Sequence, residues 1–131
     1  MSPITWISAE PVRHEYITID SQQRLYLSAA ACELLGVPKT GHFELIVGYD
    51  LVNKRLALAK PDVVRVTDVR PFRFDGRRYA HSARFVSDAE IPAAELPQRY
   101  EYTGRDYAEY PDGAYAFQLA DFDAPDDVGR S

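Results

Sequence analysis

Apolar and polar residues alternate in two short stretches near the start of the chain. Ile17 and Ile19 fall on one face of an extended strand, and Leu25 and Leu27 fall on one face of the next. Successive side chains of a strand point to opposite faces, so each stretch can bury one side. The residues between them are polar, and Asp20 opens them with a side chain suited to turns. The pattern predicts a β-hairpin.

A helical pattern follows this hairpin directly. Ser28 is a suitable N-cap, an alanine run has the highest helix propensity, and Gly36 fits the left-handed position after a helix. Pro38 prevents the helix from continuing. So short a helix is not stable alone in water, so we expect it to pack on strands.

Further alternating stretches predict more strands and little helix. We expect a second hairpin from residues 43–47 and 55–59, and later strands at 63–66, 71–74, 99–102 and 114–119. Turn residues mark Asp75-Gly76 and Pro111-Asp112-Gly113. Residues 90–96 could hold a short helix, and the pattern of residues 77–86 fits helix and strand equally.

These elements predict a mainly β fold with short helices, in which a swapped-hairpin-like β-barrel core is joined by a second β-rich half. The expected division is a hairpin–helix–hairpin module at 1–62, the second half at 63–120, and an acidic flexible tail at 121–131. The second half echoes the first weakly. Arg24-Leu25-Tyr26 and Arg77-Arg78-Tyr79 each follow an Asp-led turn, 53 residues apart. Either the unit is duplicated, or hairpins simply recur in a β-rich chain.

The net charge of −5 conceals two segments of opposite sign. Residues 63–84 carry +4 and residues 85–131 carry −8. Hydrophobic residues make up 46% of the 131-residue chain, which is enough for a core, yet no apolar run reaches the length of a membrane span. The start of the chain lacks the pattern of a signal peptide, so we expect a cytoplasmic protein.

The residues that most often carry catalytic or metal chemistry are few and scattered. Cys32 is the single cysteine and lies in the apolar helical run, where a buried side chain is expected. His14, His42 and His81 show no metal-ligand spacing. We therefore expect no metal, no cofactor and no enzymatic activity. Tyrosines 100, 102, 107, 110 and 115 could form a sheet face or a protein-binding patch.

Residues 16–60 resemble the AbrB/SpoVT (MazE-like) swapped-hairpin family of transcription factors and antitoxins. The matching features are Ile19-Asp20, Arg24-Leu25-Tyr26-Leu27, Leu35-Gly36-Val37, Phe43-Glu44-Leu45 and Leu56-Ala57-Leu58. In that family two chains interlock their hairpins, and a basic surface lies along DNA. The resemblance therefore implies a homodimeric DNA-binding transcriptional regulator.

The arginines of the expected hairpins are the candidate DNA-binding residues. They are Arg24, Arg70, Arg73, Arg77, Arg78 and Arg84. Arginines interleaved with aromatic residues can contact phosphates while they stack on bases. Cys32 and Glu33 occupy positions where the family often has arginine, Gln23 stands where it favours glycine, and Ser28 stands where it has proline.

A second reading is a non-enzymatic protein-interaction module that keeps the fold without DNA binding. The missing helix arginines and the acidic C-terminal third favour it. Such a module could be a phage or mobile-element component, an antitoxin-like protein or a DNA-mimicking inhibitor. Its protein partner would bind the tyrosine-rich, acidic C-terminal third.

Overall fold

The computed structural model describes residues 3–4, 15–104 and 110–125. Its strands are β1 (Tyr16–Ile19), β2 (Arg24–Leu27), β3 (Phe43–Asp50), β4 (Arg55–Ala59), β5 (Phe72–Phe74), β6 (Tyr79–His81), β7 (Gln98–Gly104) and β8 (Tyr115–Leu119). Its helices are α1 (Ala29–Leu35), α2 (Ala83–Asp88) and a 3₁₀ turn, η1 (Ala93–Glu95). Residues 1–2 and 5–14 of the predicted module at 1–62 lie outside the described part.

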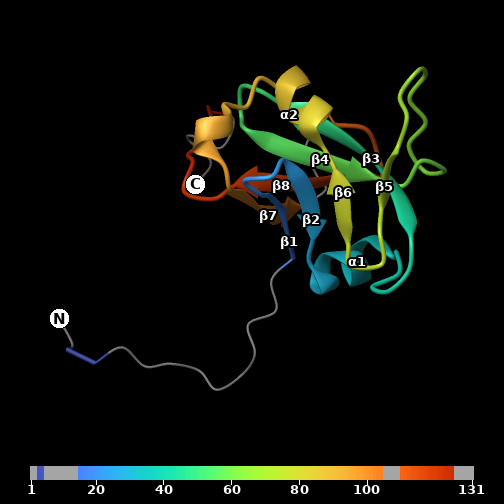
Figure 1. The fold of residues 1–131 in the computed structure, drawn as a ribbon, viewed down its shortest axis with the longest axis horizontal. Helices are drawn as coiled ribbons and strands as arrows, with labels where there is room; N and C mark the ends of the chain where they lie inside the picture. Colours follow the sequence, from blue (N-terminus) through green and yellow to red (C-terminus); the bar gives the residue numbers. More distant parts are fainter. Residues whose placement is uncertain (1–2, 5–14, 105–109, 126–131) are drawn as a thin grey trace.

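The eight strands form one antiparallel sheet in the order β5-β3-β4-β8-β7-β1-β2-β6. The sheet curls into a nearly closed barrel, with α1 across one end (Figure 1). This confirms the prediction of a mainly β fold with short helices. The division at residues 62 and 120 stays a prediction, but strands from both sides of residue 62 share the one sheet.

The two halves of the chain build the same turn after their first strand. Asp20 Oδ1 accepts backbone N–H bonds from Gln22 and Arg24, at 3.0 and 2.8 Å. Asp75 Oδ1 accepts the matching bonds from Arg77 and Tyr79, at 2.8 and 3.0 Å. Position 20 thus corresponds to position 75, an offset of 55. The offset of 53 inferred from the arginines was wrong because it aligned Arg24 with a residue inside the turn.

Both halves also end their helices alike. Gly36 at φ 73° and Glu90 at φ 59° are left-handed, and their N–H groups bond to Glu33 and Ser87 carbonyls respectively. The next residue in each half bonds back to a carbonyl in the middle of its helix. Such bonds satisfy carbonyls that a helix end leaves unpaired. The sequence predicted this ending for the first helix through Gly36, but not for the second.

The halves interlock instead of standing side by side. β1 pairs with β7 and β3 pairs with β5, so both hairpins of the first half pair with strands of the second half. β2 pairs with β6, and β4 pairs with β8, so equivalent strands of the two halves lie next to each other in the sheet. The arrangement is pseudo-twofold: Leu27 N–H donates to the Arg78 carbonyl, and Ser82 N–H donates to the Gln23 carbonyl.

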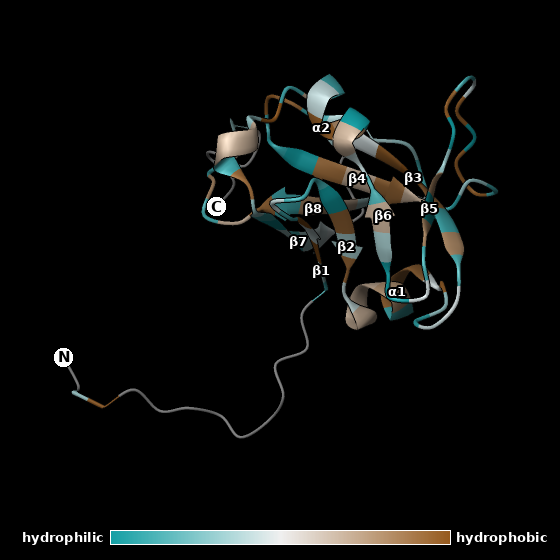
Figure 2. Cartoon of the chain, in the orientation of Figure 1, coloured by the Kyte–Doolittle hydropathy of each residue, from teal (hydrophilic) through white to brown (hydrophobic). Residues whose placement is uncertain are grey.

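Inward-facing side chains of both halves form one core. The strands alternate hydrophilic and hydrophobic residues along their length (Figure 2). The largest fully buried apolar side chains are Ile17, Ile19, Leu25, Leu27, Leu35, Leu45, Leu56, Leu58, Phe74, Tyr100 and Phe117. Cys32 is buried among them, as predicted. Neither half could bury this surface alone, because each inner face is completed by strands of the other.

Two segments differ from the sequence-based expectation. The strand predicted at 63–66 is a turn and loop, because Val63 and Val64 both bond to the Lys60 carbonyl and β4 already has strand partners on both edges. The loop instead projects from the barrel (Figure 2), and Val63, Val66 and Val69 are exposed on it. The ambiguous segment 77–86 contains both possibilities, first β6 and then the start of α2.

The expected helix within 90–96 is only the 3₁₀ turn η1, with Pro92 at its N-cap and Pro97 directly after its C-cap, where a proline disfavours a continuing helix. At the other end, the predicted tail begins with described residues, and Ala124 is buried. Residues 126–131 of that tail lie outside the described part.

Candidate nucleic-acid interface

The outer face of strands β6, β2, β1 and β7 carries a row of tyrosine and arginine side chains. Their neighbours in sequence point inward and are buried, so alternation turns these residues outward. Strand register places Tyr79 opposite Tyr26, Tyr26 opposite Thr18, and Thr18 opposite Arg99. Four strands from both halves therefore contribute to one continuous surface.

Three guanidinium groups on this face lie over three tyrosine rings. Arg99 Cζ is 3.9 Å from the centre of the Tyr16 ring, and Arg24 Cζ is 4.5 Å from that of Tyr79. Arg78 Cζ is 5.4 Å from the ring centre of the third tyrosine, Tyr26. All three distances are within the range of cation–π attraction. We call Tyr16, Arg24, Tyr26, Arg78, Tyr79 and Arg99 the tyrosine–arginine ladder.

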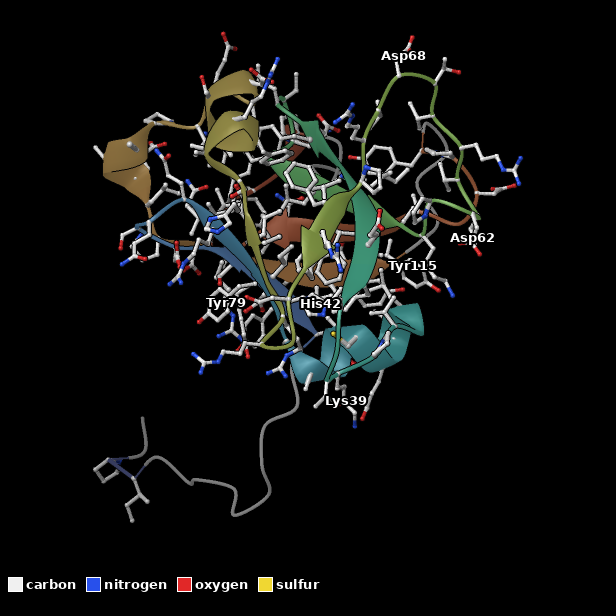
Figure 3. The ribbon with its side chains drawn as sticks, turned by 45° about the vertical axis from the view of Figure 1, so that its right-hand side comes forward. Lys39, His42, Asp62, Asp68, Tyr79 and Tyr115 are labelled. Atoms are coloured by element: carbon white, nitrogen blue, oxygen red, sulfur yellow. The ribbon has the colours of Figure 1, made fainter. Side chains whose placement is uncertain are left out.

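The three rings also contact one another. The centres of Tyr26 and Tyr79 are 4.8 Å apart, and those of Tyr16 and Tyr26 are 6.3 Å apart, both in tilted arrangements. Figure 3 shows Tyr79 on the side of the barrel away from Asp68, which marks the tip of the projecting loop. The ladder is thus a surface of its own, made from four strands and from Arg78 in the β5–β6 turn.

Two predicted DNA-binding residues belong to the ladder, and both already have partners. Arg24 Nε donates to Asp20 Oδ2 at 2.8 Å. Arg78 donates to the Leu27 and Lys39 carbonyls at 3.0 and 3.1 Å, and to Tyr26 Oη at 2.7 Å. Arg78 therefore acts first as a structural link between the β5–β6 turn and the first half. Arg24 keeps an exposed guanidinium, since 35% of its side chain is accessible.

Arg99 is the ladder cation that sequence analysis missed. Its Nε lies 3.5 Å from Glu101 Oε1 but makes no hydrogen bond, and this buried atom has no hydrogen-bond partner among the described residues. The exposed fraction of the Arg99 side chain is 40%. Arg99 also lines an open cleft of about 630 Å³ beside Gln98, Glu101 and Asp121. Its hydrogen-bonding capacity is therefore less used than that of Arg78.

The other four predicted arginines lie outside the ladder. Arg70 is in the projecting loop, Arg73 is on β5, Arg77 is in the β5–β6 turn, and all three are exposed. Arg84, on α2, is 94% exposed and lies 3.6 Å from Asp88. The structure joins only Arg24 and Arg78, of the six, through shared tyrosine contacts. Most of the predicted set does not form one continuous stripe.

Arg73 lines a second open cleft, which has mixed charge. Arg65 and His42 accompany it, and so do the carboxylates of Glu44 and Asp62. The cleft has a volume of about 730 Å³. It lies between the β3–β5 edge and the segment after β4, on the side where Figure 3 labels His42 and Asp62. Its opposed charges make it a weaker phosphate site than an all-basic groove would be.

A cluster of charged and polar side chains around the buried Arg55 links strands outside the ladder. Arg55 is fully buried and donates to Gln118 Oε1 at 2.9 Å and to Tyr110 Oη at 3.3 Å. Tyr110 in turn donates to Asp50 Oδ2 at 2.7 Å. Burial, followed by this bond to Asp50, raises the pKa of Tyr110 to about 12. These bonds join β3, β4 and β8 and give Tyr110 a structural role.

The other late tyrosines divide between core and surface. Tyr100 is fully buried, and burial raises the pKa of its hydroxyl. Tyr102 and Tyr115 are half-buried, with ring centres 6.2 Å apart, and Tyr107 lies outside the described residues. The predicted tyrosine patch for a protein partner is therefore smaller than the sequence suggested, and the partner itself stays a prediction.

The described residues hold no group of three or more histidine, cysteine or acidic side chains placed to bind a metal ion. Burial raises the pKa of the Cys32 thiol to about 11, although the charges of Arg78 and Lys39 lower it. His42 and His81 are exposed, and His14 lies outside the described part of the chain.

Sequence analysis could find the ladder residues on single strands but not their combination. Tyr16, Tyr26 and Arg99 occupy outward positions in alternating stretches, which is a readable signal. Their contacts depend on β1 pairing with both β2 and β7, a property of the complete sheet.

No family model, curated protein or solved structure matches this chain. The resemblance of residues 16–60 to the swapped-hairpin family accordingly stays a prediction. Among the described helices, none combines the length and apolar character needed to cross a bilayer.

Proposed function

We propose that this protein is a non-enzymatic, DNA-binding transcriptional regulator whose contact surface is centred on the tyrosine–arginine ladder. The supporting observation is the stacking of Arg24, Arg78 and Arg99 on tyrosine rings across four adjacent strands. A regulator of this kind would act in the cytoplasm, as its sequence also suggested.

A stacked guanidinium suits nucleic acid for two reasons. The tyrosine holds it flat, so less conformational freedom is lost when it binds, and its outer plane can stack on a base. Its N–H edge can still donate to phosphate, which supplies much of the affinity in such complexes. Arg24 and Arg99 meet both conditions best, because their side chains are 35% and 40% exposed.

The proposed regulator needs no second copy to complete its barrel. In the resembled family two chains interlock their hairpins, whereas here β5–β8 pair with β1–β4 of the same chain. We therefore infer that the DNA-binding unit is a single chain with pseudo-twofold symmetry. A homodimer of this protein would have to form through another surface.

A protein-interaction module is the second candidate, and one observation favours it. Every ladder arginine lies near a carboxylate or donates to protein oxygens: Arg24 to Asp20, Arg99 near Glu101, and Arg78 to two carbonyls. Together with the −8 charge of residues 85–131, this would suit an antitoxin-like or DNA-mimicking protein that binds another protein.

DNA binding is tested by fluorescence anisotropy with labelled DNA from the protein's own upstream region, at salt concentrations from about 50 to 300 mM. We expect binding that weakens with salt, and a loss of about tenfold in Arg24→Ala and Arg99→Ala. Lys54→Ala is the matched control, because it removes one positive charge at the β3–β4 turn, outside the ladder.

Absence of binding at the lowest salt would overturn the proposal. Equal losses in Lys54→Ala and the ladder variants would show that net charge, not the ladder, governs binding. A protein partner captured from the host lysate that persists after nuclease treatment would support the interaction module instead.

A further inference from the structure

The width of the ladder bears on the form of nucleic acid that it can bind, and this step rests on the proposed function. The ladder crosses β6, β2, β1 and β7 in one row. Neighbouring strands are about 4.8 Å apart, so the backbones of the outer two are separated by roughly 14 Å. The major groove of B-DNA is about 12 Å wide and accepts a helix or a two-stranded ribbon. The ladder face is too broad to enter it.

The ladder offers flat faces instead of groove-reading side chains. Tyr26, Tyr79 and Tyr16 are half-buried side chains on the outer face, and the guanidinium planes of Arg24 and Arg99 add two further stacking surfaces. Within a duplex the faces of the bases are covered by their neighbours in the stack. Unpaired bases can turn out and stack on aromatic rings and guanidinium planes, which is how sheet surfaces bind single strands.

The charges of this face also favour stacking over phosphate contact. Its three arginines are opposed by the carboxylates of Asp20 and Glu101, and the N–H groups of Arg78 are largely engaged. At most about three phosphates can be neutralised by the ladder, which for a single strand corresponds to a salt slope of roughly −2. A duplex ligand, limited to such backbone contacts, would gain little from the rings.

We propose that the ladder is a binding surface for single-stranded nucleic acid, with bases stacked on its tyrosine and arginine planes. Tyr79, Tyr26 and the Tyr16–Arg99 pair form successive stacking positions along the row. Single-stranded DNA is therefore preferred to the duplex of the same sequence.

The experiment compares a fluorescein-labelled 12-nucleotide strand with its 12-base-pair duplex, using the full chain at about 50 mM salt. We expect the single strand to bind at least about tenfold more tightly, with a shallow salt slope. Tyr79→Leu should weaken single-strand binding by about 5- to 100-fold, because a stacking plane is lost. Tyr79→Phe keeps the ring and should bind like the original protein.

Tyr115→Leu is the matched control, because this half-buried tyrosine lies on β8, outside the ladder. Thermal melts of all three variants establish that each is folded. Duplex binding equal to or tighter than single-strand binding would overturn this inference and leave the proposed function standing. Equal binding by Tyr79→Leu and Tyr79→Phe would also overturn it. Failure of both DNA forms to bind would overturn the inference and the proposed function together.

Discussion

Residues 16–59 and residues 72–119 follow the same path, yet different side chains support them. In the first half Ser28 Oγ caps its helix by accepting from Ala31 N–H at 3.1 Å, and Gly36 ends it. In the second half the side chain of Ser82 makes no cap bond, and Glu90 occupies the left-handed position. The residues of the first half thus define its helix ends locally, whereas the second half depends more on contacts with the first half.

The pairing between halves explains how the weaker copy is held. Ser82 bonds to the Gln23 carbonyl through both its N–H and its hydroxyl, the latter at 2.6 Å. The Ser28 hydroxyl bonds to a residue of its own half, whereas the Ser82 hydroxyl bonds to a residue of the other half. Local signals and cross-strand contacts can therefore substitute for one another at equivalent positions, and substitutions can reveal which of them each half needs.

The largest effect is expected where the halves meet in the core. Leu25 and Ala80 occupy equivalent positions and lie directly opposite each other, both buried. Leu25→Ala should lower the free energy of unfolding by about 2–5 kcal/mol through the cavity it creates. Ala80→Leu should lower it by about 1–3 kcal/mol through overpacking.

The double variant, Leu25→Ala with Ala80→Leu, restores the total volume across the join. Urea denaturation should show it to be more stable than the sum of the two single effects, by more than about 0.5 kcal/mol. Simple additivity would show that the two positions do not share one packing space, and that the pseudo-twofold relation does not extend to the core.

Removal of the two helix-start hydroxyls should have unequal effects. Ser28 Oγ accepts from Tyr16 N–H at 3.0 Å as well as from Ala31, so Ser28→Ala leaves two backbone donors without their partner. We expect a loss of about 1–3 kcal/mol. Ser82→Ala should cost only about 1 kcal/mol, because the Gln23 carbonyl still accepts from Ser82 N–H.

Chemical denaturation measures both changes, with exposed Ser87→Ala on α2 as the control. Equal losses for the two serines would contradict the view that the first helix depends more on its own cap.

The two helix ends should respond in opposite directions. Gly36→Ala places a side chain in the left-handed region and should lower the free energy of unfolding by about 1 kcal/mol. Glu90→Gly relieves the same conformation and should raise stability by about 0.5 kcal/mol. Gly48→Ala is the control, since its added carbon meets nothing within 4 Å. Thermal melts that move in one direction for both variants would refute this comparison.

The smallest effect concerns the exposed turn of the second half and depends on pH. The bond from Tyr79 N–H has the largest effect on the pKa of Asp75 and lowers it; desolvation opposes this, and the bond from Arg77 N–H adds to the lowering. A lowered pKa in the folded state stabilises the fold above the unfolded value of about 3.9, and this gain is lost as pH falls through the folded value. Asp75→Ala should therefore be less stable than the original protein at pH 7, and the difference should shrink below pH 4. A difference that is constant with pH would contradict this origin.

The sequence by itself determined the elements whose signals are local. Ser28 and Gly36 bound α1, Asp20 forms the first turn, and alternation gives β1 and β2 their inward faces, all as predicted. The mainly β class followed from these elements. Each of them depends on neighbours within a few residues, so the amino-acid sequence is enough to recognise them.

Only the tertiary structure decided which strands meet. Val63–Val66 has the composition of a strand but forms none, because the edges of β4 are occupied by β3 and β8. Arg99 reaches Tyr16 only because β7 pairs with β1. Alternation fixes which way a side chain points, whereas pairing depends on which distant edge is still free. The strand pairing that resulted brought the ladder together on one face of the sheet and left the other predicted arginines on separate parts of the surface.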